Sequence, residues 1–111
     1  LPRAVGEAHS LEVILGAKAL DAQTALAWGL ANRVVDGDAL VAGVAFAREF
    51  SRFSLPALGF AREAVQRALD TPLHEGLRIE ADLSTLAFQT EDAHEGMDAF
   101  MHKRKPAFKD R

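Results

Sequence analysis

The residues of this chain best suited to bind a ligand lie near its C-terminus, at Phe100 and Lys103. In a continuous helix, side chains three positions apart share a face, so this spacing predicts an aromatic ring beside an ammonium group. Such a pair suits an adenine ring next to a phosphate, because the ring can stack and the ammonium can pair with the negative charge. The alternative is a core phenylalanine next to a lysine that serves the helix C-terminus, and the residues alone favour this alternative.

Glu80 is a second candidate, because it interrupts the apolar arc of its predicted helix between Leu73, Leu77 and Leu83. A carboxyl group desolvated there would have a raised pKa and could act as an acid or base. A buried or interfacial carboxylate paired with an arginine or a backbone N–H explains the same pattern. We favour this second interpretation, since no other catalytic group is visibly paired with Glu80.

The sequence supports few other kinds of site chemistry. The chain has no cysteine, which excludes disulfides and thiolate zinc sites. Its histidines lack H-x-x-x-H spacing, its serines lie outside any G-x-S-x-G elbow, and its glycines form neither G-x-G-x-x-G nor a Walker loop. We therefore predict no catalytic residue, no metal site and no tightly bound cofactor within these residues.

Charge is distributed unevenly along the chain. Residues 1–101 hold 8 Lys and Arg against 15 Asp and Glu, whereas residues 102–111 hold 5 against 1. The acidic body would repel nucleic acid, so the basic tail predicts a single phosphate-bearing ligand. The acidic residues Glu91, Asp92, Glu95 and Asp98 could imitate a cation site. We favour the helix dipole as their explanation, since they crowd the start of a predicted helix.

The dominant periodicity is helical and predicts six helices and one short extended segment, at Val34-Val35. The first helix is expected over about Glu7 to Leu15, ending at Gly16. The second is expected to bury Ala22, Ala25 and Leu26 and to end at Gly29. The last is expected to end before Pro106, with Lys103 to Lys105 complementing its C-terminus. Five helix starts are predicted from capping residues: Asp21, Asp38, Ser54, Thr71 with Pro72, and Thr90.

With 49% hydrophobic and 26% charged residues, the chain suits one globular domain or part of one. No apolar run is long enough to cross a membrane, and no signal peptide is visible. We expect a soluble protein of the cytoplasm, with an organelle matrix as an alternative. The opening Leu1-Pro2-Arg3 lacks an initiator methionine, which suggests a chain cut from a longer one.

Two stretches of the sequence resemble a known family. The string LPRAVGEAHSLEVILGAKALDAQTALAWGLANRVV is similar to the middle-to-late part of crotonase-superfamily proteins. The string TPLHEGLRIEADLSTLAFQTEDAHEGMDAFMHKRKPAF resembles the C-terminal end of the enoyl-CoA hydratases in that superfamily. The most specific pieces are Ala25 to Val34 and Thr90 to Phe108. The resemblance implies the helical C-terminal region of the α/β crotonase fold, with residues 1–35 ending its core and 36–111 forming the oligomerisation and CoA-closing region.

The resemblance also implies a function. Enoyl-CoA hydratases add water to 2-enoyl-CoA thioesters, in fatty-acid or related acyl-CoA metabolism, by enolate stabilisation and general acid/base transfer. Their two glutamates and their oxyanion hole belong to an earlier part of the chain, and Glu80 matches neither glutamate. The family's adenine and ribose-phosphate contacts fall here on Phe100 and Lys103. The family also implies a trimer or dimer of trimers, with acyl-CoA as the substrate, and an isolated fragment without activity.

Two other functions remain open from the sequence. A noncatalytic helical module could dock a protein partner through its apolar arcs. Nucleic-acid binding through the basic tail is a weaker possibility, since the rest of the chain is acidic.

Overall fold

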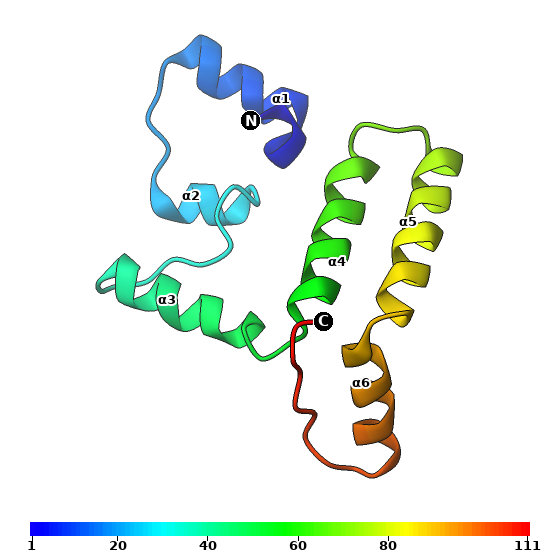
Figure 1. Ribbon diagram of the computed structural model, residues 1–111. Coiled ribbons are helices and arrows are strands. Elements are labelled where there is room, and N and C mark those ends of the chain that lie inside the picture. Colours follow the sequence, from blue (N-terminus) through cyan, green and yellow to red (C-terminus); the bar gives the residue numbers. More distant parts are fainter. The chain divides into compact units, whose positions relative to one another are not determined.

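The computed structural model describes all 111 residues and divides into two compact units, Leu1–Val44 and Ala45–Arg111 (Figure 1). It contains six helices and no strand, which confirms the expected mainly helical fold. No helix is both long and apolar enough to cross a membrane. The helices are α1 (Pro2–Gly16), α2 (Ala22–Ala27), α3 (Ala39–Phe50), α4 (Leu55–Ala68), α5 (Leu73–Phe88) and α6 (Glu91–Met101).

Helix α1 differs from its predicted bounds at both ends. It begins at Pro2, since proline is tolerated in the first turn, and it is kinked at Gly6, whose φ of 79° is not helical. At its C-terminus Ala17, rather than Gly16, takes the left-handed conformation, with φ of 47°. The buried Ser10 hydroxyl donates a 2.6 Å hydrogen bond to the Gly6 carbonyl at the kink.

Helix α2 begins where its capping residue predicts, because Asp21 Oδ1 accepts a 2.7 Å hydrogen bond from the Thr24 backbone N–H. Trp28 follows the helix and stacks on His9 of α1, with ring centroids 4.0 Å apart and planes 5° from parallel. Gly29 then turns the chain with a φ of 76°. The predicted burial of Ala22 and Leu26 is wrong: both are exposed, and Leu26 keeps 38% of its surface.

Between α2 and α3, Val34-Val35 forms no strand, since no neighbouring strand is present to pair with it. Helix α3 then begins as predicted at Asp38, whose carboxylate accepts hydrogen bonds from the Leu40 and Val41 N–H groups.

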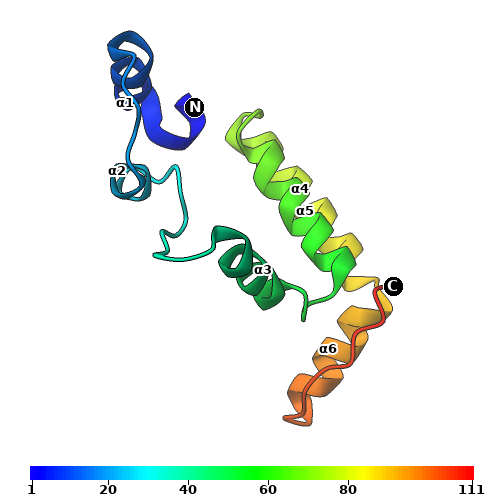
Figure 2. The same cartoon turned by 90° about the vertical axis from the view of Figure 1, so that its left-hand side faces the viewer.

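Helices α4 and α5 lie side by side and antiparallel in both views (Figures 1 and 2). Alanines on α4 face Leu83, the buried leucine of α5, across a shallow groove. Helix α6 follows α5 after a short turn. The C-terminal segment, residues 103–111, then runs back along α6 to the start of α4. There the Leu55 N–H donates a 2.8 Å hydrogen bond to Asp110 Oδ1, so the end of the chain caps α4.

The capping predictions in this unit succeed at one helix and fail at two. Thr90 Oγ1 accepts a 3.1 Å hydrogen bond from the Ala93 N–H and caps α6 as expected. Ser54 precedes α4 but its hydroxyl caps nothing, because Asp110 occupies that role. The Thr71 hydroxyl donates instead to the Arg67 carbonyl of α4 at 3.0 Å, so the predicted cap of α5 is also wrong.

Candidate functional site

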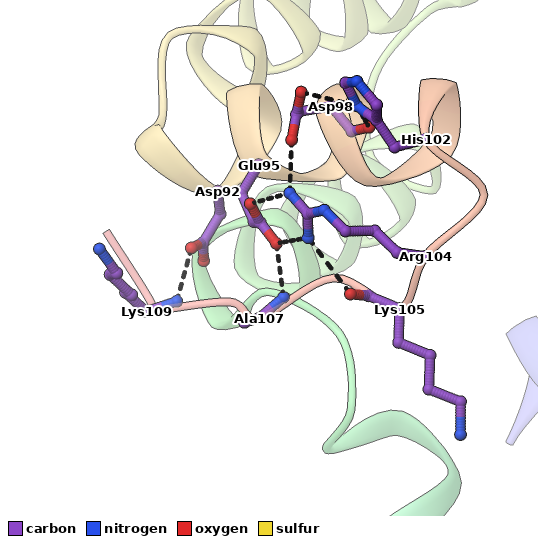
Figure 3. A network of polar contacts seen from close by, with 8 residues as sticks. All are labelled: Asp92, Glu95, Asp98, His102, Arg104, Lys105, Ala107 and Lys109. Atoms are coloured by element: carbon purple, nitrogen blue, oxygen red, sulfur yellow. Dashed lines mark hydrogen bonds and ion pairs between the residues drawn. The ribbon is translucent and has the colours of Figure 1, made fainter.

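The acidic residues of α6 bind the C-terminal segment. Figure 3 shows Asp92, Glu95 and Asp98 on one side of the helix, facing Arg104 and the backbone of residues 105–109. Glu91 also takes part, since its carboxylate accepts a 3.0 Å hydrogen bond from Nε of Arg111. Glu91 and Asp92 lie in the first turn, as the dipole interpretation expects, whereas Glu95 and Asp98 pair with Arg104.

Arg104 is held by two carboxylates. Its two terminal nitrogens contact Glu95 at 2.6 and 2.8 Å in a bidentate pair, and one of them also contacts Asp98 Oδ2 at 2.5 Å. Glu95 Oε1 additionally accepts a 2.7 Å hydrogen bond from the Ala107 N–H. A planar guanidinium matches a carboxylate edge to edge, so this pair fixes direction as well as distance.

Asp92 anchors the next part of the segment. Its side chain is buried, and its two oxygens accept hydrogen bonds from the Lys109 and Asp110 N–H groups at 2.7 and 2.9 Å. The Asp92 N–H in turn donates to the Arg111 carbonyl at 3.1 Å. No local pattern predicts that this carboxylate is buried, because its partners lie 17 and 18 residues away.

These contacts lower the pKa values of both carboxyl groups. Arg104, and next the Ala107 N–H, lower the pKa of Glu95 from its ordinary 4.5 to about 2. Burial raises the pKa of Asp92, but the N–H donors of Lys109 and Asp110 outweigh that effect, so the pKa lies below its usual value. Hydrogen bonds to Glu95, then to Asp98, raise the pKa of Arg104. All these groups are therefore charged at neutral pH.

Lys103 begins the segment in an unusual backbone conformation. The Arg104 N–H donates to the Ala99 carbonyl and the Lys103 N–H to the Phe100 carbonyl, a pattern that closes helices with a left-handed residue. Lys103 is that residue, with φ of 50°, where glycine is usual. The predicted end of α6 before Pro106 is thus confirmed, but no basic residue lies in its last turn.

Phe100 lies on the last turn of α6 with 82% of its surface exposed. It borders a groove of about 590 Å³ that carries both aromatic rings and cations. Lys103 does not line this groove; it lies beyond the helix, so the spacing rule for helical neighbours does not apply to it. The groove is lined by Arg52, Phe53, Gly96, Ala99, Phe100, Arg104, Lys105, Pro106 and Phe108.

Lys105 lines this groove, although the sequence interpretation names only Lys103 as the cation next to Phe100. It borders the same groove as Phe100, and its side chain extends away from the carboxylate network in Figure 3. Arg104 and Arg111 are neutralised by acidic partners, whereas no ion pair joins Lys103 or Lys105 to a carboxylate. The basic tail therefore has three lysines without a carboxylate partner, Lys103, Lys105 and Lys109, rather than a continuous cationic strip.

Glu80 is not the desolvated acid that its position on the helical wheel suggested. It is exposed and lines two shallow grooves between α4 and α5, where α4 contributes small side chains such as Ala61 and Ala64. These alanines leave space above the carboxylate instead of covering it. No group of three or more His, Cys, Asp or Glu side chains is arranged to hold a metal ion. The acidic residues of α6 therefore bind the C-terminal segment, residues 103–111, rather than a metal ion.

Comparison with known proteins identifies the family of the chain. A model of the family described as enoyl-CoA hydratase/isomerase matches residues 1–111. A probable enoyl-CoA hydratase from Rhizobium meliloti (strain 1021) is 46% identical over 112 residues, covering 100% of this chain and 44% of that protein. A 2,3-dehydroadipyl-CoA hydratase from Escherichia coli (strain K12) is 37% identical, with the same two coverages.

Solved structures agree with the sequence matches. A crystal structure of an enoyl-CoA hydratase from Geobacillus kaustophilus HTA426 aligns with a TM-score of 0.94 at 30% identity, covering 99% of this chain and 42% of that one. The chain thus spans less than half the length of the relatives it matches. Because the family match extends over every residue, the chain belongs to the enoyl-CoA hydratase/isomerase family.

Proposed function

We propose that this chain is the C-terminal helical part of an enzyme that adds water to 2-enoyl-CoA thioesters. In this proposal it contributes oligomer contacts and binds the nucleotide end of CoA through Phe100 and Lys103, while the catalytic glutamates and the oxyanion hole lie outside these residues. The observation that carries the proposal is the family match over residues 1–111, together with relatives named as hydratases.

The exposed ring of Phe100 supports the nucleotide part of the proposal. A phenylalanine with 82% of its surface exposed has little role in packing within this chain, and an aromatic face is suited to stack on adenine. Lys103 and Lys105 follow it within five residues and have no carboxylate partner. A ribose phosphate beside the adenine would supply the missing negative charge.

Two observations argue against nucleic-acid binding and against a noncatalytic docking module. A nucleic-acid surface needs several cations free to meet phosphates, and two of the five basic residues of the tail are paired with carboxylates. A noncatalytic docking module would not require the match to hydratases along every residue. We also propose a cytoplasmic location, with an organelle matrix as the alternative because two relatives are named as mitochondrial.

The test is to compare Phe100→Ala and Lys103→Ala with the unchanged protein, in the intact protein that carries this chain. Both variants should raise the KM for crotonyl-CoA with little change in kcat, because the contacts are remote from the reacting atoms. We expect about a tenfold increase for Phe100→Ala from the lost stacking. For Lys103→Ala we expect about three- to tenfold from the lost charge pair.

A second substrate separates nucleotide binding from general damage. Crotonyl-pantetheine carries the same thioester without the nucleotide, so its KM should not change in either variant. Lys18→Ala removes an exposed lysine elsewhere and should leave both KM values unchanged. An unaltered KM for crotonyl-CoA in both Phe100→Ala and Lys103→Ala would refute the nucleotide assignment.

A further inference from the structure

The stretch of residues 103–107, which carries Lys103 and Lys105, is fixed to α6 at both of its ends. At its start, the Arg104 N–H donates to the Ala99 carbonyl at 3.0 Å. At its end, the Ala107 N–H donates to Glu95 at 2.7 Å. Between these points, the Arg104 guanidinium contacts Glu95 and also the Lys105 carbonyl, at 3.3 Å. One carboxylate, that of Glu95, therefore holds residues 104 and 107 together.

Such fixation has a direct consequence for binding. A lysine on a mobile segment must lose backbone as well as side-chain freedom when it meets a phosphate, and this ordering weakens affinity. A backbone ordered before binding removes part of that cost. Lys103 also keeps a left-handed backbone, with φ of 50°, which an untethered lysine seldom adopts. The contacts of Arg104 on the next residue help to maintain it.

We propose that Glu95 is a positioning residue for the CoA nucleotide. Through Arg104 and the Ala107 N–H it fixes the course of residues 103–107, and so the places from which Lys103 and Lys105 reach the phosphates. This inference rests on the proposed function, and it assigns Glu95 a role although Glu95 touches no ligand. Asp98 assists, because its carboxylate accepts a hydrogen bond from Nη2 of the same guanidinium.

Positioning and simple electrostatics predict opposite effects for one substitution. Glu95→Gln removes a negative charge from the neighbourhood of the lysines, so charge alone would tighten the binding of phosphates and lower the KM. The positioning role predicts a higher KM, because an amide cannot hold the guanidinium in a charged bidentate pair. Arg104→Lys keeps the charge but loses the two-pronged geometry, so charge alone predicts no change.

The experiment measures kcat and KM for crotonyl-CoA and crotonyl-pantetheine in the intact protein with Glu95→Gln or Arg104→Lys. We expect the KM for crotonyl-CoA to rise about two- to tenfold in both variants, because the backbone of residues 103–107 would then have to be ordered on binding. The kcat and the KM for crotonyl-pantetheine should not change. Glu63→Gln, which breaks the 2.6 Å pair with Arg67 on α4, is the matched control and should alter neither KM.

Three results would overturn the positioning role. One is an unchanged or lower KM for crotonyl-CoA in both variants. Another is an equal rise for the two substrates, which would indicate a structural role only. If Glu95→Gln fails to fold, Arg104→Lys alone decides between these outcomes. The third is a KM that rises for crotonyl-CoA alone in Phe100→Ala and Lys103→Ala but not in Glu95→Gln. That result would contradict the role of Glu95 and leave the proposed function intact. If the KM for crotonyl-CoA rises selectively in none of the four variants, both the role of Glu95 and the nucleotide assignment are wrong.

Discussion

At the scale of single residues, Glu95 shows how one carboxylate can organise a segment that has no regular structure. Its two oxygens receive an arginine fork and a backbone N–H from residues 9 and 12 positions later. Charge-assisted hydrogen bonds of this kind are among the stronger polar contacts in proteins. Asp92 repeats the arrangement with two backbone N–H groups of the same segment. The segment is thus ordered by carboxylates rather than by an apolar core.

The lowered pKa of Glu95 predicts how the segment responds to acid. The folded pKa of about 2 lies below the ordinary 4.5, so the stabilising contribution of Glu95 is complete above about pH 4.5. It is lost as the pH falls through about 2. Carbon-13 NMR of the Glu95 carboxyl should therefore show a titration midpoint near 2. Arg104→Lys should move that midpoint upward. A midpoint of 4.5 in the unchanged protein would contradict the network.

Sequence reasoning reached some of these residues and missed others for a physical reason. Phe100 and Lys103 are candidates from the sequence because they lie in one short motif. The partners of Asp92 and Glu95 were not found, because a pattern of charge cannot reveal that the chain reverses direction after Lys103. The helical wheel placed Glu80 correctly on the face of α5 toward α4, but it could not show that Glu80 is exposed, since it takes no account of the small side chains on α4 that face it.

At the scale of elements, local caps were predictable and long-range caps were not. Asp21, Asp38 and Thr90 accept hydrogen bonds from N–H groups two or three residues later, so their roles are contained in the local sequence. Helix α4 is capped instead by Asp110, which lies 55 residues beyond Leu55. Thr71 looks like a cap in the sequence, but its hydroxyl donates to the Arg67 carbonyl and accepts no N–H group of α5.

This contrast gives a paired prediction for two threonines that precede helices. Thr90→Ala should lower the free energy of unfolding by about 1 kcal/mol, the usual cost of losing a helix cap. Thr71→Ala should cost less than about 0.5 kcal/mol, because the hydroxyl of Thr71 caps nothing. Thermal unfolding of the intact protein measures both. Thr90→Ser should restore stability, since it keeps the accepting oxygen. Equal losses in the two alanine variants would contradict the assigned caps.

At the scale of the whole molecule, the chain exposes more surface than its size requires. It presents 8839 Å² to solvent. A folded monomer of 12.0 kDa exposes roughly 6,000 Å². Much of the excess is apolar, as at Leu40 and Leu73, which keep 74% and 79% of their surfaces exposed. Such surface is typical of regions that pack against other protein. It agrees with the proposal that these helices support a larger catalytic unit and an oligomer.

The most direct test of nucleotide binding by Phe100 and Lys103 is a crystal structure of the intact protein with CoA bound. We expect the adenine ring to lie against Phe100, within van der Waals distance. We also expect a phosphate oxygen about 2.7–3.2 Å from the ammonium nitrogen of Lys103. Adenine bound elsewhere, with Phe100 and Lys103 free of the nucleotide, would contradict the claim.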